Sequence, residues 1–88
     1  MKTIQITVRG KVQGVGFRYY TKKKADGLNI KGFVQNKPDG SVYIEAEGNA
    51  LDIDTFADWC ELGPQWSRVL ECKKSVLPQA AFTKFEIR

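Results

Sequence analysis

The start of the chain alternates regularly between apolar and polar residues. Ile4, Ile6 and Val8 fall on one side of an extended segment, and polar residues fall on the other. Over residues 17–28 the apolar spacing becomes that of a helix with one core-facing stripe, formed by Phe17, Thr21, Ala25 and Leu28. The pattern therefore predicts a strand, a loop and then a helix.

The remaining chain divides into five further elements. Strands are predicted over residues 30–36 and 41–47, joined by the turn Lys37-Pro38-Asp39-Gly40. Asn49 is the predicted N-cap of a second helix that Gly63-Pro64 ends. The apolar stripe of this helix is Ile53, Phe56, Ala57 and Cys60. A fourth strand is predicted over about residues 68–74, and a last short strand over residues 82–88, with Phe85 and Ile87 facing inward.

The order of elements predicts the fold class. It is strand, helix, strand, strand, helix, strand, followed by a short C-terminal strand. Two strand-helix-strand units joined through a hairpin interleave into one sheet, and right-handed crossovers place both helices on the same face. We therefore expect an α+β protein with a ferredoxin-like sandwich, in which two helices cover an antiparallel sheet.

Composition narrows the function classes. The 88 residues fit one domain spanning 1–88, and no apolar run is long enough to cross a membrane. No signal peptide is evident, so we expect a cytoplasmic location. The net charge of +4 suits an anionic ligand but is too small to indicate nucleic acid by itself.

The chain contains no histidine and two cysteines. Catalysis cannot use an imidazole base, which excludes the usual Ser/His and Cys/His schemes. Cys60 and Cys72 do not form a Cys-x-x-Cys pair, and a zinc site without histidine would need an unusual ligand set. We expect two buried free thiols.

Trp59 and Trp66 are interpreted as packing residues at the helix edge and in the following loop.

The loop between the first strand and the first helix is rich in glycine, with Gly10, Gly14 and Gly16. Amides of such a loop can converge on an anion at the positive end of a helix. Arg18 adds a permanent charge with a forked geometry that matches two phosphate oxygens. The spacing fits neither a Walker loop nor the dinucleotide fingerprint. By spacing alone, a tight turn with a solvated Arg18 is an equal alternative.

Asn36 ends the second predicted strand, directly before the turn. Its amide can donate and accept hydrogen bonds together, as holding a water molecule requires. Taken alone, it is better explained as a residue that caps the turn beside Pro38.

Together the two stretches resemble the acylphosphatase family. Both signature segments match, and they read Val8-x-Gly10-x-Val12-Gln13-Gly14-Val15-x-Phe17-Arg18 and Gly32-Phe33-Val34-Gln35-Asn36-x-x-x-Gly40-x-Val42, followed by Gly48. The resemblance implies hydrolysis of the carboxyl-phosphate bond of an acyl phosphate, to carboxylate and inorganic phosphate, without metal or other cofactor. It implies phosphate binding by Arg18 and by the loop residues, and positioning of the attacking water by Asn36. The phosphate-binding residues are then Gln13, Gly14, Val15, Gly16, Phe17 and Arg18.

The missing histidine fits this chemistry. Phosphoryl transfer depends mainly on positioning and charge stabilisation. The leaving carboxylate has a pKa of about 4 to 5, as side-chain carboxyls do, and needs no general acid. We expect a monomer that binds acyl phosphate and inorganic phosphate, with no nucleic-acid or membrane partner.

Two other functions remain as alternatives. An RNA-recognition module has a similar layout, and Lys31-Gly32-Phe33-Val34 superficially resembles part of its aromatic motif, but the first strand carries no aromatic residue. A non-catalytic anion-binding domain is the second, since larger hydrogenase-maturation proteins carry a similar domain and fold does not fix function.

Overall fold

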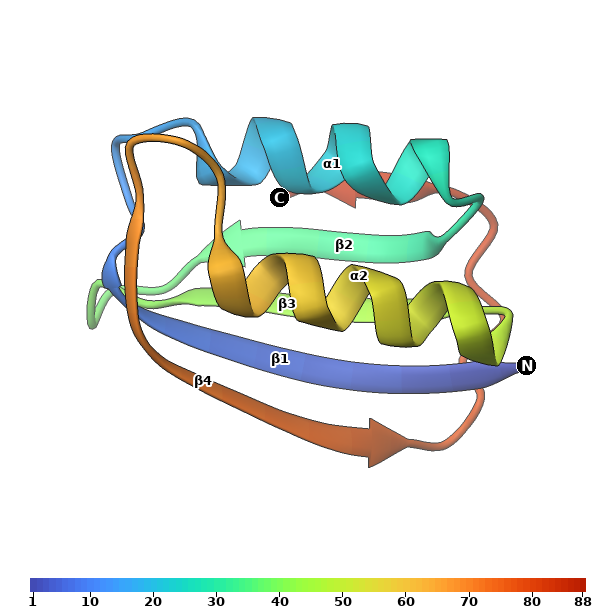
Figure 1. The fold of residues 1–88 in the computed structure, drawn as a ribbon. Coiled ribbons are helices and arrows are strands. Elements are labelled where there is room, and N and C mark those ends of the chain that lie inside the picture. The colour runs from blue at the N-terminus through green and yellow to red at the C-terminus, as the bar shows by residue number, and fades with distance from the viewer.

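The computed structural model describes residues 1–88 and contains two helices on one face of a five-stranded sheet (Figure 1). Helix α1 packs over the side of the sheet formed by β2 and β5, and helix α2 packs over β1, β3 and β4. In chain order the elements are β1 (Lys2–Lys11), α1 (Phe17–Gly27), β2 (Lys31–Asn36), β3 (Val42–Gly48), α2 (Ala50–Leu62), β4 (Arg68–Leu77) and β5 (Phe85–Ile87).

The strands are ordered β4-β1-β3-β2-β5. Three of the four pairings are antiparallel, as predicted, with Ile6 opposite Ile44 in the centre. The last strand, β5, runs parallel to β2 and makes the sheet mixed. At Gly32 the backbone of β3 leaves no room for a side chain, since a Cβ there would clash with the carbonyl oxygen of Glu45. The ferredoxin-like α+β fold is therefore confirmed, with one parallel edge added.

The core lies between the sheet and the two helices. Both predicted helix stripes point into it: Phe17, Thr21 and Ala25 are buried on α1, with Leu28 half-buried beyond the helix end. The predicted stripe of α2 is buried in full. From the sheet come the alternating residues of the first and third strands, Ile4, Ile6, Val8, Val42, Ile44 and Ala46. Each large aliphatic side chain so buried contributes about 1.5–3 kcal/mol.

Several sequence expectations were wrong in detail. Strand β4 continues to Leu77 rather than ending near residue 74, because it pairs with β1 as far as Thr3. Strand β5 covers only Phe85–Ile87, and Ile87 is 43% exposed although Phe85 is buried. The β5 strand is the edge of the sheet, so alternation there does not ensure burial. Trp66 is 73% exposed in the turn before β4, whereas Trp59 packs against Phe17 and Phe56 as expected.

A buried carboxylate holds the segment that leads into β5. Glu47, in β3, is 3% exposed and accepts a hydrogen bond from the hydroxyl of Thr3. It also accepts bonds from the backbone amides of Ala80, Ala81 and Phe82. These bonds lower the pKa of Glu47, and the bond from Thr3 contributes most. Burial acts in the opposite direction, because it disfavours the charged carboxylate. In the alternating pattern of residues 41–47, Glu47 falls on the polar side with Tyr43 and Glu45, so the pattern alone does not predict this buried anchor.

Cys60 and Cys72 are free thiols, as expected, but only Cys60 is fully buried. Burial raises the pKa of the Cys60 thiol well above its ordinary value. Neither helix combines the length and the apolar character that crossing a bilayer requires.

Candidate active site

A cleft of about 230 Å³ lies where the loop after β1, the start of α1 and the end of β2 meet. These three segments lie at the same end of the sandwich (Figure 1). The residues that line the cleft are Val12, Gly14, Gly16, Phe17, Arg18, Tyr19, Asn36 and Ile87. Segments far apart in the sequence, including both signature segments, therefore converge on one hollow.

The N-terminus of α1 faces this cleft without a cap of its own. Gly16 is the N-cap residue, in the left-handed region at φ 78°, and no side chain accepts a hydrogen bond from the first-turn amides. The first turn also carries no acidic residue. A Cβ on Gly14, whose φ is 74°, would meet no atom within 4 Å, so the loop is open on this side. Unpaired amides at the positive end of a helix favour an anion here.

Arg18 is the second residue of α1 and is half-buried in the cleft wall. Its Nη1 donates a hydrogen bond of 3.4 Å to the main-chain oxygen of Arg88. This long bond leaves the other guanidinium donors available, and they could meet phosphate oxygens in a forked arrangement. The backbone amides and the guanidinium thus supply the positive charge of the cleft.

Asn36 is the last residue of β2 and lines the same cleft as the start of α1. The turn that follows it is capped by Asp39, which accepts hydrogen bonds from the amide and the hydroxyl of Ser41. The alternative role for Asn36, capping this turn, is therefore taken by another residue. Asn36 is half-buried, and its amide can both donate and accept hydrogen bonds.

The predicted site residues divide into two groups. Gly14, Gly16, Phe17, Arg18 and Asn36 line the cleft together. Gln13 and Val15 do not line it: the side chain of Val15 packs against the core, and that of Gln13 reaches the β2–β3 turn. Sequence reasoning missed Val12, Tyr19 and Ile87 in the cleft wall. Tyr19 directly follows the predicted site residue Arg18, and this adjacency was the available signal for it. The position of Ile87 depends on the parallel pairing of β5 with β2.

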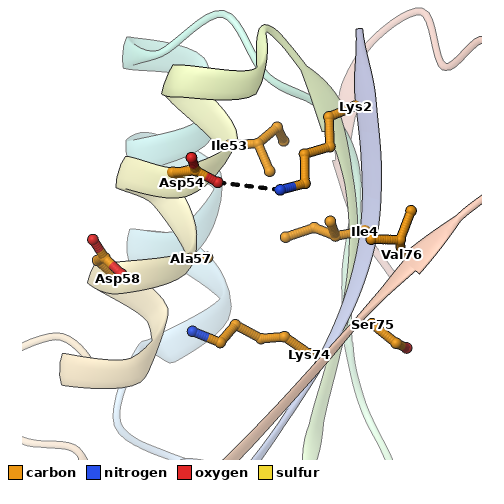
Figure 2. A pocket seen from close by; sticks show the side chains of 9 residues that line it. All are labelled: Lys2, Ile4, Ile53, Asp54, Ala57, Asp58, Lys74, Ser75 and Val76. Carbon is orange, nitrogen blue, oxygen red and sulfur yellow. Dashed lines mark hydrogen bonds and ion pairs between the residues drawn. The ribbon is translucent and has the colours of Figure 1, made fainter.

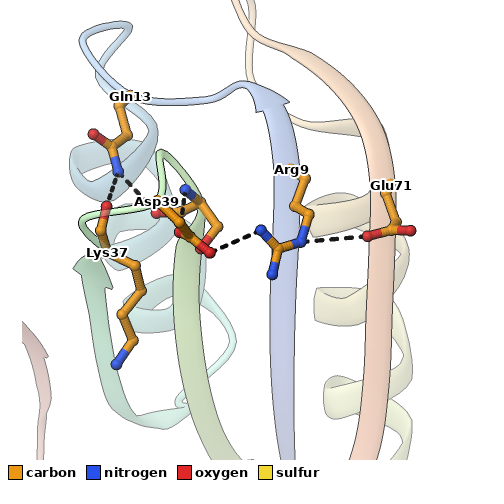
Figure 3. A network of polar contacts seen from close by, with 6 residues as sticks. Arg9, Gln13, Lys37, Asp39 and Glu71 are labelled. Atoms are coloured by element: carbon orange, nitrogen blue, oxygen red, sulfur yellow. Dashed lines mark hydrogen bonds and ion pairs between the residues drawn. The ribbon is translucent and has the colours of Figure 1, made fainter.

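Polar contacts hold the β2–β3 turn from both sides (Figure 3). On one side, Nε2 of Gln13 donates to the carbonyl oxygens of Lys37 and Ser41, at 2.8 and 2.9 Å. On the other, Arg9 pairs with Asp39 at 2.8 Å and with Glu71 at 3.4 Å. Hydrogen bonds from Ser41 and from Arg9 hold the pKa of Asp39 well below its usual range. The turn next to Asn36 is thereby fixed to β1 and to the glycine-rich loop.

A second hollow, of about 280 Å³, lies between α2 and the strands β1 and β4 (Figure 2). Its walls combine Ile4, Ile53 and Val76 with an ion pair of 3.3 Å between Lys2 and Asp54. None of the residues that the sequence predicted for the site lines it. Of these two hollows, only the smaller cleft is lined by residues of the predicted site.

The comparisons with known proteins identify the family. The family model described as Acylphosphatase matches residues 4–87. The chain belongs to the acylphosphatase family. An acylphosphatase of Oceanobacillus iheyensis is 42% identical, and the match covers 100% of this chain and 99% of that protein. An acylphosphatase of Archaeoglobus fulgidus is 44% identical over 99% of this chain and 98% of its own length.

Solved structures give the same result. The crystal structure of acylphosphatase from Bacillus subtilis superimposes with a TM-score of 0.96 at 34% identity, covering 100% of this chain and 99% of that one. Full-length HypF, in a phosphate- and nucleotide-bound form, matches with a TM-score of 0.88 at 31% identity, over 99% of this chain but 12% of its own. Membership of the acylphosphatase family makes this chain a hydrolase that acts on acyl phosphates.

Proposed function

We propose that this acylphosphatase holds the phosphoryl group of its substrate on the backbone amides of residues 13–18 and on the guanidinium of Arg18. Asn36 positions the water molecule that attacks phosphorus. The observation that carries the proposal is the single cleft in which Arg18, Asn36 and an uncapped helix N-terminus meet. A phosphoryl group in this cleft has positive charge on one side and a polar amide on the other.

The reaction then follows from elementary chemistry. The water oxygen forms a bond to phosphorus, and the bond between phosphorus and the acyl oxygen breaks. The carboxylate leaves with the electron pair of that bond, and inorganic phosphate remains on the loop. The leaving group is a weak base, with a pKa of about 4 to 5, and departs without a proton. We propose that the proton of the attacking water passes to a phosphate oxygen of the substrate.

Electrostatics accounts for the acceleration. Charge accumulates on the phosphoryl oxygens as the reaction proceeds, and fixed amides and a guanidinium stabilise it without reorganising. The chain has no histidine to supply a general base, and the proposed proton route needs none. We propose that hydrolysis requires no metal ion and no other cofactor.

We further propose that the chain acts in the cytoplasm as a single-domain monomer, on a small acyl phosphate rather than on nucleic acid. The open face of the sheet supports the last point. Phe33, in the segment that resembles an RNA-binding motif, is 7% exposed. Phe82 packs edge-on against it, and the guanidinium of Arg88 lies 3.9 Å above its ring. Bases cannot stack on a covered ring.

The role of Asn36 is tested by Asn36→Ala in a benzoyl phosphate assay, in which hydrolysis is followed by the loss of absorbance with EDTA present. We expect kcat to fall about 10²- to 10³-fold, the scale for one positioned polar group, while inhibition by inorganic phosphate is retained. A large loss of phosphate affinity at unchanged kcat would assign Asn36 to binding instead. Loss of the wild-type activity in EDTA would contradict the metal-free mechanism.

A further inference from the structure

The side chain of Gln13 joins the two halves of the cleft. Gln13 directly precedes Gly14 in the loop, and Lys37 directly follows Asn36 in the turn. Both hydrogens of the Gln13 amide are used, on the carbonyl oxygens of Lys37 and Ser41 (Figure 3). One side chain thus connects the phosphate loop to the segment that carries Asn36.

The two carbonyl oxygens also hold the turn itself. That of Lys37 accepts a second hydrogen bond from the amide of Gly40, at 3.1 Å, and that of Ser41 accepts one from the amide of Lys37, at 2.8 Å. Each oxygen therefore receives one bond within the turn and one from Gln13. The contacts are half-buried, so solvent competes only partly for these acceptors.

We propose that Gln13 is a positioning residue for hydrolysis, which sets the distance between the phosphate loop and Asn36 through its two hydrogen bonds. This inference rests on the proposed role of Asn36 and assigns to the Gln13 side chain a task other than phosphate binding. In-line attack requires the water oxygen and phosphorus to be placed within a fraction of an ångström, and a misplacement of 1 Å can cost about 10²-fold in rate.

The chemistry of glutamine suits this task. Two carbonyl acceptors at the two ends of the β2–β3 turn need two donors fixed in one plane, and a primary amide supplies both from one nitrogen. Glutamate offers no donor when ionised, and methionine has a similar length with none at all. Asparagine keeps the amide but is one methylene shorter. The position is therefore testable with variants that change the donors while keeping the volume.

The decisive experiment is a double-mutant cycle with Gln13→Met, Asn36→Ala and the combined variant. Steady-state hydrolysis of benzoyl phosphate gives kcat and KM, and inorganic phosphate gives an inhibition constant. We expect Gln13→Met alone to lower kcat about 10- to 10²-fold and to change phosphate inhibition less than about threefold. The combined variant should be no slower than Asn36→Ala within about twofold, because the lost bonds act through Asn36.

Gln5→Met is the matched control. Gln5 is another half-buried glutamine, placed on β1 itself. Its Nε2 donates to Ser75 at 2.7 Å, its Oε1 accepts from the hydroxyl of Tyr43 at 2.8 Å, and it is not among the residues that line the cleft. Removing these two bonds across the sheet should leave kcat and phosphate inhibition unchanged. A lowered kcat in Gln13→Met with an unchanged kcat in Gln5→Met separates positioning from a general loss of stability.

Three results would overturn the inference. The first is an unchanged kcat in Gln13→Met. The second is a multiplicative loss in the combined variant, which would mean that Gln13 acts independently of Asn36. The third is a rise in KM and in the phosphate inhibition constant at constant kcat, which would place the side chain in phosphate binding. If Gln13→Met does not fold, Gln13→Asn replaces it. The variant that combines Gln13→Asn with Asn36→Ala should then again be no slower than Asn36→Ala alone, within about twofold.

The proposed function fails in a different way. Full activity of Asn36→Ala alone would remove the role of Asn36 and the inference with it. A slow Asn36→Ala combined with an unaffected Gln13→Met would leave the proposed function standing and reject the positioning role.

Discussion

The two helices of this protein begin in opposite ways. At the start of α2, the side chain of Asn49 accepts a hydrogen bond of 3.0 Å from the amide of Leu51, and Asp52 lies in the first turn. At the start of α1, Gly16 offers no side-chain acceptor, and the first turn carries no acid. Helix α2 thus caps one first-turn amide with a side chain and carries a carboxylate near the positive end of its dipole, whereas α1 has neither.

This difference has a physical consequence. A side-chain cap stabilises a helix by about 1 kcal/mol, and a first-turn carboxylate by about 0.3–1 kcal/mol. Helix α1 has neither the cap nor the carboxylate at its start, where Phe17 is buried in the core. The amides left free are those that a phosphoryl group can bind. The first-turn amides can donate either to a side-chain cap, which stabilises the helix, or to a bound anion. The same amides cannot do both at once.

The largest effect should come from removing the charge at the uncapped end. Arg18→Ala leaves the amides but removes the guanidinium, and we expect kcat/KM to fall by at least about 10³-fold, as for other arginines that stabilise phosphoryl transfer. Arg18→Lys should also be strongly impaired, because an ammonium group cannot reproduce the fork. The benzoyl phosphate assay measures both variants. Near-normal activity in Arg18→Ala would contradict the phosphate cradle.

A smaller effect should follow when the first turn of α1 is given an acidic residue, as the first turn of α2 has. Tyr19, 58% exposed, occupies the third position of α1, which corresponds to that of Asp52 in α2. In Tyr19→Asp, a carboxylate would compete with phosphate for the amides. We expect the phosphate inhibition constant to rise about tenfold, which corresponds to 1.4 kcal/mol. Thermal unfolding without phosphate should show an unchanged or slightly raised Tm.

Two control variants test whether the added charge on α1 causes the effect. Tyr19→Asn removes the ring without adding charge, so a tenfold loss there would attribute the effect to the ring. Asp52→Asn removes the acid from α2 and should leave hydrolysis unchanged.

The smallest effect on activity should come from Asn49→Ala. This change removes the cap of α2, and we expect the free energy of unfolding to fall by about 1 kcal/mol. Denaturant titration measures the loss, and kcat/KM should remain at the wild-type value because Asn49 lies outside the cleft lining. A reduced kcat/KM in a fully folded Asn49→Ala sample would show that the two helix starts are not independent.

Local pattern predicted the elements because each depends on neighbours in the sequence. The stripe of α2, the cap at Asn49 and the turn at Pro38 were placed correctly for this reason. Positions that depend on distant partners were not. The full length of β4 required β1 as its partner, the exposure of Ile87 required the parallel edge beside β2, and the burial of Glu47 required the amides of residues 80–82.

For the site, the sequence by itself determined which groups are available: glycines that permit left-handed backbone, a permanent charge at Arg18, an amide at Asn36 and no imidazole. These follow from residue type and short-range order. Only the tertiary structure decided that the loop and the end of β2 share one cleft, and that the side chain of Gln13 turns away to the β2–β3 turn. The reason is that strand order and register set these distances, and both are fixed by core packing across the whole sheet.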